Sequence, residues 1–121
     1  MSIGEYAFDN CYDLTSITIP NSVTNIDKRA FYCCYGLTSI TIPSSVTSIG
    51  RTAFDGCFHL ASIKVDEGNS TYDSRNDCNA VIETANNNLL FGCKGTIIPY
   101  GVTSIGERAF DNCSELSSII I

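Results

Sequence analysis

The stretch LTSITIP occurs twice in the chain, at Leu14–Pro20 and at Leu37–Pro43, with the same letters in the same order. The spacing from Leu14 to Leu37 defines a period, and a fixed period of this length is typical of repeat architectures, in which each repeat packs on its neighbours. The last two isoleucines of the stretch lie two positions apart, so they point to the same side of a strand, and the proline ends the hydrogen-bonded run. We therefore predict one short strand in each repeat, and we call each repeat a rung.

The rest of the period follows the strand in a constant order. The pattern Val-Thr-x-Ile-Gly predicts a turn, and its Gly position, held once by Asp27, is interpreted as a residue with positive φ. The pattern Ala-Phe-x-x-Cys-x-x-Leu then spaces apolar residues three apart, which predicts a short helix or 3-10 turn. Strand, turn and short helical return together predict an α/β-type solenoid.

One rung departs from the period. The segment from Ala53 to Ala109 is longer than two full periods, so it contains an insertion. The extra residues include Ala80–Glu83 and Leu89–Phe91, two β-like runs on either side of asparagines that accept left-handed conformations. We expect a β-hairpin on the convex side in place of one helical return. The strand of this rung is expected to persist, ending at Ile98 and Pro99.

Length and charge restrict the class of protein. The 121 residues fit one domain over residues 1–121, with about five rungs, the irregular one at about 66–98, and both ends expected to be truncated and uncapped. The formal net charge of −6 argues against nucleic acid as a partner. No apolar run approaches the roughly 20 residues of a spanning helix, so membrane insertion is not expected.

Four of the seven cysteines, namely Cys11, Cys34, Cys57 and Cys113, occupy one slot of the repeat. A shared slot indicates packing, and thiols buried beside phenylalanines should be poor nucleophiles. The chain has no CxxC pair and a single histidine, His59, so zinc is not expected. A disulfide stays open, with Cys78 and Cys93 the best candidate pair because both lie in the irregular segment.

These patterns resemble the BspA-like, or Treponema pallidum-type, leucine-rich repeat family. The resemblance is carried by IGEYAFDNCYDLTSITIP, IGRTAFDGCFHLASI, VTSIGERAFDNCSELSSI and the variant rung NAVIETANNNLLFGCKGTIIP. It implies a curved solenoid with a parallel sheet on its concave side, within a larger secreted or surface-attached bacterial protein. It also implies partners among host matrix proteins, glycans or other bacterial surfaces.

The concave sheet supplies the first candidate binding residues. If Leu14, Ile17 and Ile19 point into the core, the residues between them point outward. The outward positions are Ser16, Thr18, Ser39, Thr41, Ser62 and Lys64. This hydroxyl-rich surface suits a flat protein or glycan ligand, and it equally suits a solvated surface that avoids aggregation. An ice-binding role is disfavoured because Lys64 interrupts the row.

An aromatic slot of the repeat supplies the remaining candidate binding residues. Tyr12, Tyr35 and Phe58 each follow a repeat cysteine and are expected at the rim of the concave sheet. Such a ladder either stacks on sugars and anchors a partner, or packs rung upon rung. Both interpretations remain open at this point.

Metal binding and catalysis find little support. Asp9, Asp55 and Asp111 recur in one slot, but Cys33 interrupts the neighbouring Asn or Gly slot that a calcium ladder would need. The chain has no Gly-x-Ser-x-Gly elbow and no phosphate-binding glycine loop, so we expect neither an enzyme nor a cofactor. An adhesion module and a purely structural spacer remain as alternatives, and uncapped apolar ends would favour homo-oligomers formed by stacking.

Overall fold

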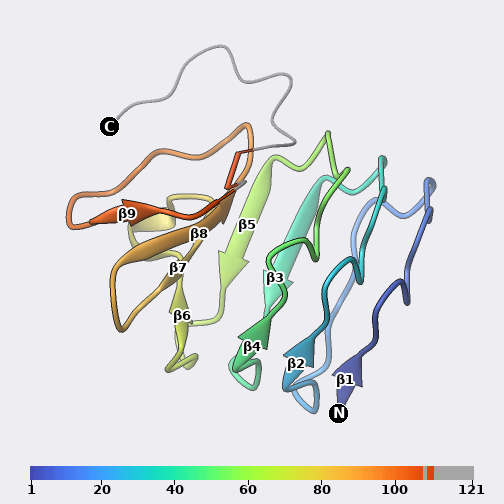
Figure 1. Ribbon diagram of the computed structural model, residues 1–121, viewed down its shortest axis with the longest axis horizontal. Helices are drawn as coiled ribbons and strands as arrows, with labels where there is room; N and C mark the ends of the chain where they lie inside the picture. The colour runs from blue at the N-terminus through green and yellow to red at the C-terminus, as the bar shows by residue number, and fades with distance from the viewer. Residues whose placement is uncertain (108, 111–121) are drawn as a thin grey trace.

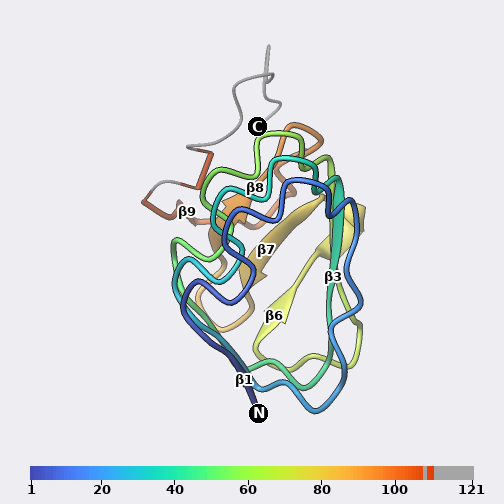
Figure 2. The same ribbon diagram turned by 90° about the vertical axis from the view of Figure 1, so that its right-hand side faces the viewer.

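The computed structural model describes residues 1–107, 109 and 110, and consists of short strands joined by turns (Figure 1). The elements in chain order are β1 (Ser2–Ile3), β2 (Asn25–Ile26), β3 (Ser39–Ile42), β4 (Ser48–Ile49), β5 (Ser62–Val65), β6 (Tyr72–Asp73), the 3-10 helix η1 (Arg75–Asp77), β7 (Ala80–Glu83), β8 (Asn88–Gly92) and β9 (Ser104–Ile105). Successive rungs lie side by side, and after a 90° turn their outlines nearly superimpose (Figure 2). Within these residues no helix is long and apolar enough to cross a membrane.

The repeated stretch forms the predicted strand. β3 and β5 pair in parallel, with Ile40 opposite Ile63 and Thr41 opposite Lys64. Side chains alternate along both strands, since the isoleucines are buried while Thr41 and Lys64 are exposed. The first rung contributes a single bridge, Thr18 to Thr41. We call this ladder the hydroxyl sheet.

A second parallel ladder lies in the segment that was predicted to be a plain turn. β1, β2 and β4 pair in the order β1-β2-β4, with Ile3 opposite Ile26 and Ile26 opposite Ile49. The prediction of positive φ at the following Gly position is wrong, because only Gly56 and Gly101 among the described glycines have positive φ. At Gly50 the reason for glycine is close approach, since a Cβ would lie 2.4 Å from the backbone nitrogen of Lys28.

The returns are chains of turns, so of the two predicted forms, a short helix or a 3-10 turn, they correspond to the turn. Each return keeps isolated bonds between residues three apart, such as Ala30 N–H to the carbonyl of Asp27. Between them, the N–H groups of Phe31 and Cys33 donate at 2.8 Å to carbonyls of Ala53 and Asp55 in the next rung. A helix cannot continue when alternate donors are used between rungs. In the described part of the chain the one helical element is η1.

The predicted hairpin is present. β7 and β8 pair antiparallel, and Asn87 between them has φ 59°, which is the left-handed conformation expected of these asparagines. β8 then pairs in parallel with β9, with Leu89 opposite Ile105, as β2 pairs with β4. The hairpin therefore continues the second type of ladder through β8 and β9, and is not simply a cover over a return.

The strand expected near Ile98 and Pro99 does not form, so the hydroxyl sheet ends at β5. Side chains of the irregular rung satisfy the free edge instead. The N–H of Val65 donates to Ser74 Oγ at 2.9 Å, and the N–H of Ile63 donates to Asn79 Oδ1 at 3.4 Å. These side chains take the place of a further strand.

Matching apolar side chains from successive rungs fill the interior. Phe31, Ile26, Leu37, Ile42 and Ile63 are fully buried. Phe31 stacks on Phe8 and on Phe54, each at 5.1 Å between ring centroids and within 7° of parallel, and Phe91 continues the row at 4.9 Å. The repeat thus stacks like on like. The predicted core positions Leu116, Ile119 and Ile121 lie outside the described residues.

Candidate functional site

Hydroxyl groups serve different purposes in different parts of the chain. Several outside the hydroxyl sheet connect rungs: Thr24 donates to the carbonyl of Met1, Thr38 to that of Thr15 and Thr47 to that of Thr24. Six polar side chains lie on the hydroxyl sheet, namely Ser16, Thr18, Ser39, Thr41, Ser62 and Lys64. These side chains make no hydrogen bond or ion pair within the described residues. The fold does not use these six polar groups, so they are available to a ligand.

The register brings the predicted residues into two rows. Ser39 lies opposite Ser62, and Thr41 lies between Thr18 and Lys64. Neighbouring strands of a sheet are about 4.8 Å apart, so each row repeats at that spacing. The face is mostly neutral, and Lys64 places one positive charge at its β5 end.

The aromatic slot is exposed but already paired with itself. Tyr12 stacks on Tyr35 at 5.0 Å and 5°, and Tyr35 stacks on Phe58 at 5.4 Å and 9°. Tyr12 is 53% exposed, Tyr35 38% and Phe58 39%. Since both faces of Tyr35 are covered by its neighbours, its ring presents edges and a hydroxyl to solvent. Stacking of a sugar on Tyr35 would require the ladder to open, so this geometry favours rung-to-rung packing.

Of the repeat cysteines, Cys34 and Cys57 are buried in the core as predicted, Cys11 is half-buried against it, and Cys113 lies outside the described residues. The thiol of Cys34 donates to the carbonyl of Phe8 at 3.0 Å, and that of Cys57 donates to the carbonyl of Phe31 at 3.3 Å. Burial raises the pKa of Cys34 to about 11 and that of Cys57 to about 12. Thiols that stay protonated are poor nucleophiles. Cys78 and Cys93, the disulfide considered above, are free, as are the other four described cysteines.

The slot beside the recurring aspartates has a conformational explanation. Asn10, Cys33 and Gly56 all have positive φ, at 58°, 58° and 83°. Asparagine and glycine recur there because they tolerate the left-handed conformation, whatever the neighbouring aspartate does. No group of three or more His, Cys, Asp or Glu that could hold a metal ion occurs in residues 1–107, 109 and 110. Asp111 lies outside that part.

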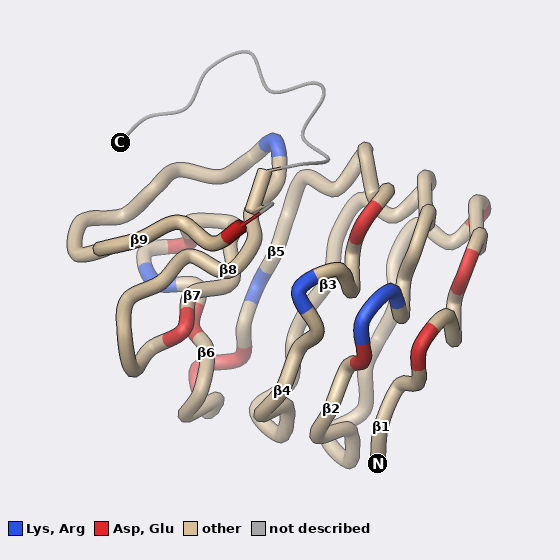
Figure 3. Tube along the Cα trace, in the orientation of Figure 1, with Lys and Arg blue, Asp and Glu red and all other residues tan. Residues whose placement is uncertain are grey.

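Charged residues recur along another edge of the rungs (Figure 3). Lys28 lies 3.9 Å from Glu5, and Arg51 lies 3.3 Å from Glu107. Both pairs are well exposed, so each is expected to contribute at most about 1 kcal/mol. They offer no isolated basic surface for an anionic partner.

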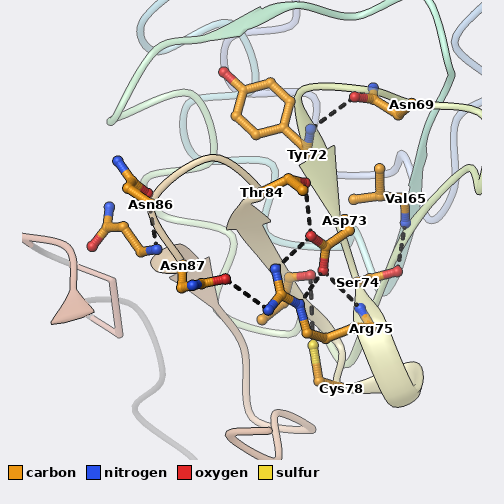
Figure 4. A network of polar contacts seen from close by, with 12 residues as sticks. Val65, Asn69, Tyr72, Asp73, Ser74, Arg75, Cys78, Thr84, Asn86 and Asn87 are labelled. Carbon is orange, nitrogen blue, oxygen red and sulfur yellow. Dashed lines mark hydrogen bonds and ion pairs between the residues drawn. The ribbon is translucent and has the colours of Figure 1, made fainter. Parts of the chain in front are cut away.

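The irregular rung contains a more closely bonded polar cluster (Figure 4). Arg75 Nε donates to Asp73 Oδ1 and Arg75 Nη2 donates to Asp73 Oδ2, both at 2.7 Å. Thr84 Oγ1 also donates to Asp73 Oδ2 at 2.7 Å. Arg75 Nη1 also donates to Asn87 Oδ1 at 2.9 Å. Partial burial alone would raise the pKa of Asp73, but these hydrogen bonds outweigh it and hold that pKa below its ordinary value. The cluster ties β6 and η1 to the hairpin.

Two adjoining hollows lie where β3 and β5 end. One is about 330 Å³ and is lined by residues that include Thr18, Asn21, Thr41, Pro43 and Asp66. The other is about 410 Å³ and extends from Asp66 into the irregular rung. Sequence reasoning did not identify Asn21 or Asp66. The available signal was that Asp66 replaces the proline that ends the strand in the first two rungs.

The repeat pattern matches a known family over the whole chain. The model of the BspA type leucine rich repeat region fits residues 1–88 and 89–121 in six copies. The chain belongs to this family. Its fold is accordingly of the leucine-rich-repeat type.

Solved structures agree with the family assignment. A leucine rich cell surface protein from Faecalibacterium prausnitzii A2-165 is 30% identical, with a TM-score of 0.73 over 99% of this chain and 38% of that chain. A leucine-rich repeat protein from Bacteroides ovatus ATCC 8483 is 33% identical, with a TM-score of 0.62 over 99% of this chain and 28% of that one. This leucine-rich repeat chain thus spans well under half of either protein. No curated protein is similar enough in sequence to count as a relative.

A third structure shares the fold alone. The pneumococcal vaccine antigen PcpA is 18% identical, with a TM-score of 0.60 over 80% of this chain and 31% of that one. At this identity the likeness concerns the repeat architecture only.

Proposed function

We propose that this leucine-rich repeat chain is a non-enzymatic binding module of a secreted or cell-surface bacterial protein. Its ligand, a protein or glycan of a host or of another bacterium, lies on the hydroxyl sheet, which we infer to be the concave face of the rungs. The observation that carries the proposal is that all six polar side chains on the hydroxyl sheet are unpaired within the described residues, whereas Thr38 and Thr47, outside the sheet, each bond to a neighbouring rung.

The alternative is a structural spacer with no ligand of its own. It is favoured by the literal repetition of Thr15, Ser16 and Thr18 in the second rung, since a surface fitted to one ligand tends to vary between rungs. The stacked Tyr12, Tyr35 and Phe58 also serve the architecture. The two functions differ in whether the exposed sheet contributes to binding.

A double variant separates them. Ser39→Glu with Ser62→Glu places two carboxylates on the hydroxyl sheet, and Ser2→Glu with Ser48→Glu places two on the second ladder as a control. We expect the sheet variant to lose at least tenfold in affinity for immobilised host matrix proteins or glycans, with the control binding like the unmodified chain. Urea unfolding should confirm that both variants remain folded. Equal binding by all three proteins, or none by any, would favour the spacer.

A further inference from the structure

The two hollows at the ends of β3 and β5 adjoin at Asp66, and we call them together the depression. β3 ends at Ile42 and β5 ends at Val65, and the hollows are lined by the last residues of these strands and by residues beyond them. Asp66 lines both of them. The first reaches back to Thr18 in the first rung, and the second reaches forward to Asp77 in the irregular rung. Volumes of about 330 and 410 Å³ lie within the range of small-molecule sites, so the depression suits a ligand of at least two units.

Most side-chain polar groups in the first hollow have no partner in the described part of the chain. The hydroxyls of Thr18 and Thr41 and the amide of Asn21 make no hydrogen bond to any residue in the described part of the chain. Asp66 is held in place because its Oδ1 accepts the N–H of Gly68 at 2.9 Å, while its other oxygen has no partner there. Hydroxyls and amides both donate and accept, and a carboxylate accepts twice. This mixture complements the hydroxyl groups of a sugar.

Other ligand classes fit less well. A peptide gains affinity by adding to a free strand edge or by placing apolar anchors in pockets, whereas these hollows lie at strand ends and are lined mainly by polar groups. An anionic ligand would be repelled by the carboxylates of Asp66, Glu67 and Asp77 in the second hollow. Lys64 is the cation in the lining that could offset this repulsion. The guanidinium of Arg75 is already engaged by Asp73. A neutral or amine-bearing ligand avoids this repulsion.

We propose that this depression is the binding groove for a neutral or amine-bearing oligosaccharide, which lies across the rungs with one sugar unit beside Asp66. The hydroxyls of Thr18 and Thr41 bond the unit in the first hollow, and the second hollow holds the next unit. This inference rests on the proposed binding function and assigns its ligand class.

Chemical-shift mapping of the ¹⁵N-labelled chain tests the assignment. The probes are cellohexaose, maltohexaose, mannohexaose and a chitosan hexamer, with a heparin hexasaccharide and a lysine-rich peptide for comparison. We expect at least one of the first four to shift the amides of Thr18, Thr41 and Asp66. Affinity should fall at least tenfold in Asp66→Asn, which keeps the acceptor for Gly68, and in Thr41→Val. The matched control Thr15→Val should bind normally.

The outcomes distinguish this inference from the proposed function. If none of the four sugars shifts these amides, or if only heparin or the peptide does, the oligosaccharide assignment is overturned. Equal losses in Thr15→Val and Thr41→Val would also overturn it. If the Ser39→Glu and Ser62→Glu variant still loses its surface ligand in those cases, the binding function stands with a different ligand.

Discussion

Glycine occupies Gly50 and Gly56 for two different backbone reasons. Gly50 provides room, since a Cβ would meet the backbone of Lys28 in the rung beside it. Gly56 provides conformation, with φ 83°, in the slot where Asn10 and Cys33 are also left-handed. A sequence shows both as glycine, so the repeat pattern alone assigned positive φ to the wrong slot. The packing distance between rungs, which decides the first case, is visible only in three dimensions.

Replacing Gly56 with alanine should be costly. The left-handed conformation costs a residue with a Cβ about 1–2 kcal/mol, and the new Cβ would lie 2.9 Å from Cα and N of Cys33. We expect Gly56→Ala to lower the free energy of unfolding by about 2–4 kcal/mol, as measured by urea denaturation. Gly4→Ala is the matched control, because no atom lies within 4 Å of its Cβ and its φ is not positive. Equal stability of both variants would contradict the argument.

Among the elements, the hairpin was the most predictable because its signal is local. Two β-like runs flank asparagines, and Asn87 adopts the left-handed conformation that such a turn needs. The short strands β1, β2 and β4 were not predicted, since each is defined by a partner one full period away in the chain. The returns were predicted as a short helix or a 3-10 turn, and apolar spacing of three could not decide between the two because it does not reveal that alternate N–H groups bond between rungs.

The polar cluster that ties β6 to the hairpin should make stability depend on pH. Partial burial opposes the charge on Asp73, but hydrogen bonds from Arg75 and Thr84 hold its pKa below the ordinary value. A carboxyl group with a lowered folded-state pKa stabilises the protein above its unfolded pKa of about 4. That stabilisation is lost as the pH falls through the lower, folded-state pKa.

The predicted result is a larger loss of stability in the unmodified chain than in Asp73→Asn when urea unfolding is compared at pH 7 and pH 2. Asp73→Asn keeps the shape of the side chain but removes the charge that Arg75 binds. Asp9→Asn is the control, because it removes one carboxylate from an exposed return. If Asp73→Asn and Asp9→Asn changed the pH dependence equally, the cluster would have no special role.

For the molecule as a whole, the sequence predicted the architecture better than the site. The constant period identified the core ladder of Phe8, Phe31 and Phe54 because like residues must stack in successive rungs. It also placed the exposed hydroxyls correctly, since strand alternation determines which side chains face out. The hollows at Asp66 were not predicted because they lie where the period breaks. A repeat pattern reports what the rungs share, so it does not show a hollow that forms where they differ.

The stacked interior predicts that rungs unfold together. Phe31 is fully buried and contacts Phe8 on one side and Phe54 on the other, so Phe31→Ala opens a cavity that touches three rungs. We expect a loss of about 3–5 kcal/mol in the free energy of unfolding. Tyr35→Ala, in the exposed ladder, should lose about 1 kcal/mol, because solvent already covers part of its ring.

Amide hydrogen exchange shows whether that loss spreads. In a repeat protein each rung is stabilised by its neighbours, so Phe31→Ala should speed exchange at Ile26 and at Ile49, which lie in ladder positions of adjacent rungs. Tyr35→Ala should leave both amides nearly unchanged and thus controls for a general loss of packing. If exchange rose at Ile26 alone, or if the two variants lost equal stability, the rungs would be independent units and the phenylalanine ladder would not couple them.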